Sequence, residues 1–233
     1  IGHVTKEGSL AGPRVLEHLV DVVLYLEGDS RLGVRFVRGV KNRFGPTPAL
    51  GMFEMGEAGL RELEDPVEVL APMRSRPRPG VVLFPGVEGR RPVLVEIQAL
   101  VSPSRSAMPR RSVNGIESSR LHQVLAVLER HTGLHLSGSE VYAAATGGVR
   151  LREPAVDLAV ALAVASSATG TVMSATAAWG EVGLTGELRE VGGTRIRRDE
   201  VARVGIDKVI AAGPDGLDLG AALASAGISI PGR

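Results

Sequence analysis

The strongest constraint on the fold is a break in composition at residues 71–80. These ten residues read Ala-Pro-Met-Arg-Ser-Arg-Pro-Arg-Pro-Gly, with three prolines and three arginines. Proline fixes its own backbone φ and donates no hydrogen bond, so this stretch is a poor helix or central strand and a good semi-rigid spacer. The sequence therefore predicts two domains, residues 1–70 and residues 81–233, joined by an exposed linker at residues 71–80.

The pattern of apolar residues predicts strands in the first region and alternating strands and helices in the second. Such alternation is typical of an α/β or α+β fold, which is the fold class we expect. The expected strands are residues 19–26, 34–40, 50–55, 80–85, 92–101, 140–145, 177–182, 186–191, 208–211 and 228–230, and the expected helices are residues 118–131, 155–167, 195–204 and 217–226.

A cationic run follows the second expected strand. Lys41, Asn42, Arg43, Phe44 and Gly45 place two cations, an amide and an aromatic ring where a strand ends in a loop. Cations and amides at a strand end can hold phosphate oxygens. The alternative is that these cations, with the arginines of the preceding strand, form a solvated strand face.

Several kinds of site are missing from the sequence. There is no cysteine, and the five histidines lack the spacing of a zinc motif, so no metal site is expected in this chain. There is no GxxxxGK[ST] loop to wrap nucleotide phosphates, so the chain alone should not hydrolyse ATP. The formal net charge is only +1, so any nucleic-acid contact must be local.

No apolar stretch reaches the roughly 18 residues that a membrane span needs. We therefore expect a cytoplasmic protein with no membrane contact.

The chain begins with Ile1 rather than Met and opens in what reads as the middle of a strand. We expect it to be part of a longer protein.

The first region resembles the RadA/Sms family of bacterial recombination proteins. The resemblance rests on residues 1–21, on the run Lys-Asn-Arg-Phe-Gly at residues 41–45, and on Gly-Met-Phe-Glu-Met at residues 51–55. It implies that residues 1–70 are the C-terminal part of a RecA-like ATPase core. ATP and Mg²⁺ would bind the full-length protein outside this chain, and zinc would bind only an upstream four-cysteine module. The resemblance assigns coupling between nucleotide and DNA to Lys6, Lys41, Asn42, Arg43, Phe44 and Gly45.

The second region resembles the proteolytic domain of Lon, through Val141-Tyr142, Gly147-Gly148, residues 180–188 and Gly192-Gly193. Lon peptidases use a serine whose proton passes to a neutral lysine. The serine position holds Ala155 or Asp157, depending on register, and the lysine position holds Arg195, whose guanidinium stays charged. The resemblance therefore implies a Lon-like scaffold without the catalytic dyad.

Two groups of arginines in this region are candidates for DNA phosphate contacts. The alternative for each group is a solvated surface or a subunit interface. The first group is Arg105, Arg110, Arg111 and Arg120, and the second is Arg195, Arg197 and Arg198.

Together the resemblances imply part of a DNA repair protein that acts, when intact, as a hexameric DNA-dependent ATPase or helicase. It would promote branch migration in homologous recombination on single-stranded and branched DNA. The Lon-like domain would bind DNA and scaffold the ring. The alternatives are a module that only oligomerises and, less favoured, a peptidase of the Lon class.

Overall fold

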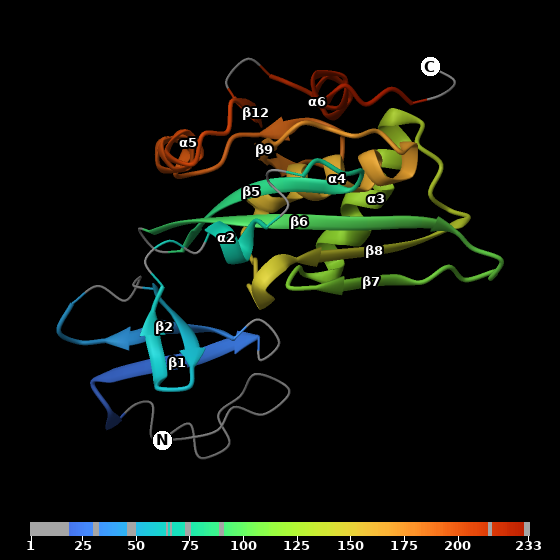
Figure 1. The fold of residues 1–233 in the computed structure, drawn as a ribbon. Coiled ribbons are helices and arrows are strands. Elements are labelled where there is room, and N and C mark those ends of the chain that lie inside the picture. The colour runs from blue at the N-terminus through green and yellow to red at the C-terminus, as the bar shows by residue number, and fades with distance from the viewer. Residues whose placement is uncertain are drawn as a thin grey trace. The chain divides into compact units, whose positions relative to one another are not determined.

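The structure, a computed structural model, describes residues 19–29, 33–45, 50–63, 65, 67–72, 76–88, 91–213 and 216–230. The chain divides into two compact units (Figure 1). The first comprises Ile1–Glu64 with Glu88–Arg91, and the second comprises Asp65–Val87 with Pro92–Arg233. Each unit has its own sheet and its own buried apolar residues.

The first unit contains an antiparallel meander of four strands. They are β1 (Val22–Asp29), β2 (Val34–Asn42), β3 (Leu50–Gly56) and β4 (Gly59–Glu62), and each pairs with the next. Phe36 lies opposite Met52 in the β2–β3 pair, and both side chains are buried. Leu24 and Leu26 lie on the other face of the meander and are 63% and 61% exposed, so that face is apolar and open.

The second unit is built on a six-stranded mixed sheet with the order β12-β9-β5-β6-β8-β7. The pairs β12–β9, β9–β5 and β8–β7 are parallel, whereas β6–β8 is antiparallel. A separate two-stranded sheet pairs β10 (Glu181–Val182) with β11 (Leu188–Arg189). The strands of the large sheet are β5 (Val81–Glu88), β6 (Arg91–Pro103), β7 (Arg111–Asn114), β8 (Ser139–Ala145), β9 (Thr176–Trp179) and β12 (Lys208–Ala211).

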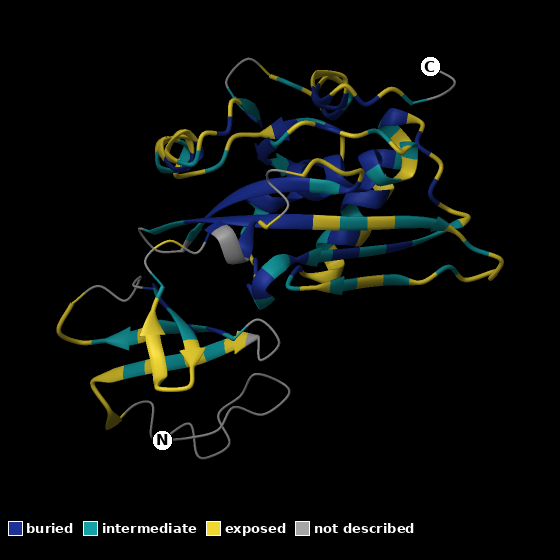
Figure 2. Cartoon of the chain, in the orientation of Figure 1, coloured by how far each residue is buried: buried dark blue, intermediate teal, exposed yellow. Residues whose placement is uncertain are grey.

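Helices α3 (Ser118–Thr132), α4 (Asp157–Thr169) and α6 (Leu219–Ala226) contact one another, and α4 packs against β8 and β9. In Figure 1, α3 and α4 lie on the same side of the sheet. Helix α4 is buried from Asp157 to Ser166, because its residues are almost all apolar and small. Figure 2 shows this helix and the central strands as the buried part of the unit. The remaining elements are α2 (Val67–Leu70), α5 (Thr194–Arg203) and the 3₁₀ turns η1 (Thr146–Gly148) and η2 (Pro154–Val156).

The predicted α/β class is confirmed, and all four predicted helices are present within a few residues of their expected bounds. Strands β4 and β7 were not expected, because they are short and polar. The predicted strand at residues 228–230 is wrong. There, Gly227 ends α6 in the left-handed conformation, and the N–H of Ile228 donates to the carbonyl of Leu223.

Residues 65–70 belong to the second compact unit, whereas the sequence assigned them to the first domain. The physical reason is that Val67 and Leu70 of α2 are buried there, and α2 contacts η1. At the end of the predicted linker, the N–H of Gly80 donates to Ser166 Oγ at 2.9 Å, and its carbonyl accepts from the N–H of Ala99. These contacts anchor the chain just before β5.

Candidate nucleic-acid interface

The cationic run forms a tight turn at the end of β2. Asn42 Oδ1 accepts the N–H of Phe44 at 3.0 Å, which bends the chain sharply after the strand. The backbone N–H of Arg43 donates to the carbonyl of Asp21, and its Nη1 lies 3.2 Å from Asp21 Oδ1. The turn leaves the ring of Phe44 81% exposed. Lys41 lies at the end of β2 and Gly45 ends the turn, whereas Lys6 falls outside the described residues.

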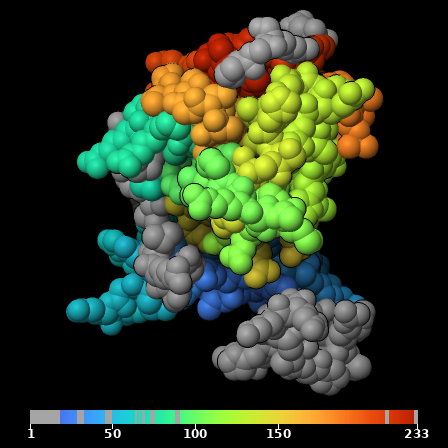
Figure 3. All heavy atoms as spheres, turned by 90° about the vertical axis from the view of Figure 1, so that its right-hand side faces the viewer, coloured from blue at the N-terminus to red at the C-terminus, as the bar shows by residue number. Residues whose placement is uncertain are grey.

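The first arginine group starts in the loop between β6 and β7, where Arg105 and Arg110 are exposed. The loop is held by serine hydroxyls: Ser104 Oγ accepts the N–H of Ser106, and Ser106 Oγ accepts the N–H of Met108. Figure 3 views the molecule from the side on which this loop lies, and the loop appears there in green at the surface. Exposed cations on an ordered loop can reach phosphate groups.

Arg110 also lies beside Tyr142, at the foot of this loop. The hydroxyl of Tyr142 donates to Glu140 Oε2 at 2.7 Å, and this hydrogen bond raises the pKa of the phenol. The nearby Arg110 guanidinium opposes that shift. A carboxylate, a phenol and a guanidinium therefore form one polar group on β8 and the loop.

Arg111 and Arg120, by contrast, bind groups within the second unit. Arg111 donates to the carbonyl of Leu136 at 2.7 Å and to that of Ser139, so it connects the start of β7 to the start of β8 and to the chain just before it. Arg120 Nη1 lies 2.7 Å from Asp157 Oδ2, and the Arg120 side chain is only 20% exposed. A DNA contact by either arginine stays a prediction, but each already has a structural partner.

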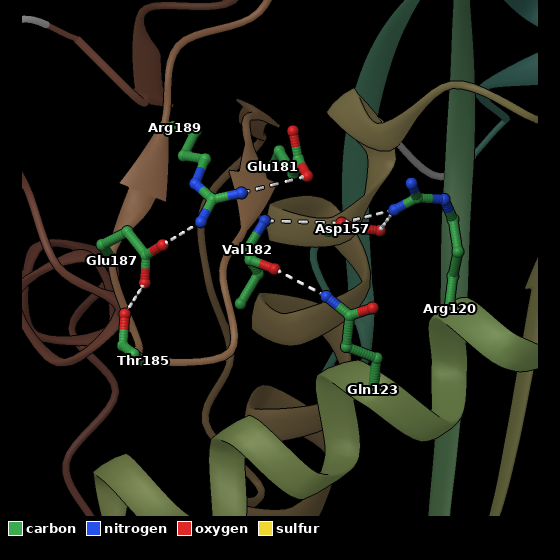
Figure 4. A network of polar contacts seen from close by, with 8 residues as sticks. All are labelled: Arg120, Gln123, Asp157, Glu181, Val182, Thr185, Glu187 and Arg189. Carbon is green, nitrogen blue, oxygen red and sulfur yellow. Dashed lines mark hydrogen bonds and ion pairs between the residues drawn. The ribbon is translucent and has the colours of Figure 1, made fainter.

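Asp157 is the buried centre of a polar network at the start of α4 (Figure 4). Its carboxylate accepts from Arg120 and from the N–H of Val182, and the carbonyl of Val182 accepts from Gln123. Burial raises the pKa of Asp157 from 3.8 to about 6, although Arg120 pulls it down. The network joins α3, α4 and β10.

The second arginine group is also divided by burial. Arg197 is 2% exposed and lies over the ring of Phe84, with 5.6 Å from guanidinium carbon to ring centroid. It donates to the carbonyl of Pro85 at 2.5 Å and forms an ion pair with Glu153. Arg195 and Arg198 are exposed on the same helix, α5, and Arg198 lies 5.9 Å from the Trp179 ring centroid.

The positions predicted to replace a peptidase dyad contain no nucleophile and base. Ala155 is buried in η2, and its carbonyl accepts the N–H of Gly180 at 2.9 Å. Asp157 is bound to Arg120, and Arg195 is exposed on α5. The two residues predicted for the serine position therefore differ in role: Ala155 packs in the interior, and Asp157 forms an ion pair.

Sequence reasoning missed the role of Glu153, which holds Arg197 and also accepts the N–H of Val87 at 3.0 Å. The only signal was an acid just before Pro154 at the start of a strongly apolar helix.

In the described ranges, no three His, Asp or Glu side chains form a group that could hold a metal ion. None of the helices in those ranges is long and apolar enough to span a bilayer.

No protein-family model matches the chain. It is 48% identical to the DNA repair protein RadA of Brucella abortus over 206 residues, which are 88% of this chain and 44% of that protein. It is also 48% identical to the DNA repair protein RadA of Bacillus subtilis over 211 residues, which are 90% of this chain and 46% of that protein. With the DNA repair protein RadA of Streptococcus pyogenes the identity is 43% over 236 residues, and the match covers 100% of this chain and 52% of that protein.

The chain thus spans about half the length of the curated relatives that it matches. Over that half, nearly every second residue is identical, which is far more than a shared fold alone requires. The chain belongs to the family of the DNA repair protein RadA.

Proposed function

We propose that this chain contacts DNA through the exposed arginines of its second unit. The observation that carries the proposal is the β6–β7 loop, which holds Arg105 and Arg110 at the surface. Arg195 and Arg198 form a second exposed pair on α5. The family name of the relatives supports a role in DNA repair. Phosphate contacts of this kind bind DNA without reading its sequence.

The intact protein would be a hexameric ring that uses ATP and Mg²⁺ to drive branch migration on single-stranded and branched DNA. The resemblance of the first region to RecA-like ATPase cores supports this reading. The turn at residues 41–45 would then offer Arg43 and Phe44 to a neighbouring subunit or to DNA, because both are exposed. The second unit would serve as a Lon-like scaffold of the ring, without peptidase chemistry.

The DNA contact is tested by fluorescence anisotropy of the 233-residue chain with labelled single-stranded and branched oligonucleotides at low salt. The variant R105Q/R110Q should bind both about tenfold more weakly, since each phosphate contact contributes roughly 1 kcal/mol or less at a solvated surface. R130Q is the matched control, because Arg130 is an exposed arginine in the last turn of α3, outside the β6–β7 loop. Equal binding by R105Q/R110Q and R130Q would remove the loop from the interface.

A second function, association with other chains, is favoured by one observation in the first unit. Leu24 and Leu26 expose one apolar face of β1, and exposed apolar patches often mark protein contacts. If this face joins copies of the chain, L24S/L26S should lower the mass measured by sedimentation equilibrium. R105Q/R110Q should leave that mass unchanged. A monomeric wild-type chain at high concentration would contradict association through this face.

A further inference from the structure

A groove of about 440 Å³ lies beside the edge strand β7, and none of the predicted sites includes it. It is lined by two segments that are far apart in the sequence, residues 113–117 and residues 150–152. The first segment runs from β7 into α3, and the second lies between η1 and η2. Its volume is in the range of small-ligand sites.

The two segments are joined by backbone contacts. Ile116 and Leu151 form a parallel β-bridge, and the N–H of Leu151 donates to the carbonyl of Gly115 at 2.7 Å. Gly115 has φ +74°, and a Cβ added to it would lie 2.3 Å from the carbonyl oxygen of Val149. Only glycine fits this close approach, so the groove has a fixed backbone frame.

Two arginines face this groove from the second segment. Val149 and Leu151 are buried, whereas Arg150 and Arg152 are exposed, as expected for an extended chain with alternating sides. The two guanidinium groups therefore project from one side of the chain, from Cα atoms about 7 Å apart.

The charge balance of the groove is positive. Within the described residues, Arg150 and Arg152 have no hydrogen bond or ion pair, in contrast to Arg120 and Arg197. Glu117 is the single carboxylate in the lining, and Asn114 adds an exposed amide that can donate. Two cations against one carboxylate leave a net positive charge.

We propose that this groove binds the phosphate group of a phosphorylated ligand through Arg150 and Arg152. A guanidinium offers paired N–H donors that match phosphate oxygens, and here two such groups lie free on one rigid frame. The phosphate can come from a free nucleotide or from a nucleic-acid strand. The site does not require the DNA contacts proposed above, because it uses other arginines.

The test is an NMR titration of the 233-residue chain with inorganic phosphate, then AMP, then a short single-stranded oligonucleotide. We expect all three to shift the backbone amides of residues 114–118 and 150–152. R150Q/R152Q should weaken these shifts about tenfold or more, since both charge-assisted contacts are lost. The variant E117Q should strengthen them by removing the repelling carboxylate.

R130Q is the matched control and should titrate like the wild type. Saturation by AMP at lower concentration than by the oligonucleotide would identify a free nucleotide as the source, and the reverse would identify a strand. No shift at these amides with any of the three probes, or equal shifts in R150Q/R152Q, would overturn the proposal. R105Q/R110Q should retain the phosphate response even if DNA binding through the β6–β7 loop fails its own test.

Discussion

Arg120 and Asp157 join two helices of the second unit through one guanidinium nitrogen, which lies within 2.9 Å of both carboxylate oxygens. Arg120 comes from the first turn of α3, and Asp157 is the first residue of α4. Asp157 is buried, so its charge depends on this partner. Arg120, which the sequence predicts as a DNA contact, therefore stabilises the packing of α3 against α4.

Replacing Arg120 by Gln should lower the free energy of unfolding by about 3 kcal/mol at pH 7, because it leaves the buried Asp157 carboxylate without its counterion. Urea unfolding measures the loss. R130Q should change stability by less than about 0.5 kcal/mol, as expected at an exposed position. An R120Q variant as stable as the wild type would show that the ion pair is not required.

The same carboxyl should make stability depend on pH. Burial raises the pKa of Asp157 from 3.8 to about 6, so the folded protein holds this proton more tightly than the unfolded chain does. The contribution of Asp157 to stability is then greatest below its unfolded pKa of 3.8 and declines as the pH rises to about 6. Unfolding curves should show this decline in the difference between wild type and D157N. A difference that grows with pH over this window would contradict it.

Arg197 should be a structural residue rather than a surface contact. R197K should cost about 3 kcal/mol, since an ammonium group cannot serve Glu153 and the carbonyl of Pro85 with the same planar donors. R195Q, on the exposed side of the same helix, is the control and should be nearly neutral in thermal unfolding. Equal melting temperatures for R197K and the wild type would refute this role.

Gly115 should tolerate no side chain. G115A combines a positive φ with a Cβ placed 2.3 Å from the Val149 oxygen, so we expect a loss of more than about 2 kcal/mol. Gly133 has a similar φ of +78° but nothing within 4 Å, and G133A should lose only about 1 kcal/mol. Chemical denaturation of both variants separates the clash from the backbone strain. Equal losses would show that the frame of the groove can relax.

The pattern of apolar residues along the chain predicted much of the fold, because the burial of each element dictates that pattern. Helix α4 is apolar and buried from Leu158 to Ala165, and β1 alternates between exposed and half-buried residues. Strand β7 escaped prediction because its residues Arg-Ser-Val-Asn form a strand only by pairing with β8. Its stability comes from tertiary hydrogen bonds, which no local pattern reveals.

The candidate site was harder to predict than the fold. The sequence grouped seven arginines by their proximity along the chain, and the structure separates them by partner. Arg111, Arg120 and Arg197 bind carbonyls or carboxylates inside the unit, whereas Arg105 and Arg195 are exposed. The acids that make this difference, Asp157 and Glu153, lie 37 and 44 residues from their arginines. Such distant pairs leave no trace in local charge patterns.

The central claim is that the exposed arginines, and not the buried or half-buried ones, hold DNA phosphates. It is tested most directly by the salt dependence of DNA binding, because each released counterion adds to the slope of log affinity against log salt. The variant R105Q/R110Q should lower the magnitude of that slope by about 2, or about 1 for each lost contact, while R130Q keeps the wild-type value. A slope for R105Q/R110Q identical to that of the wild type would contradict the account.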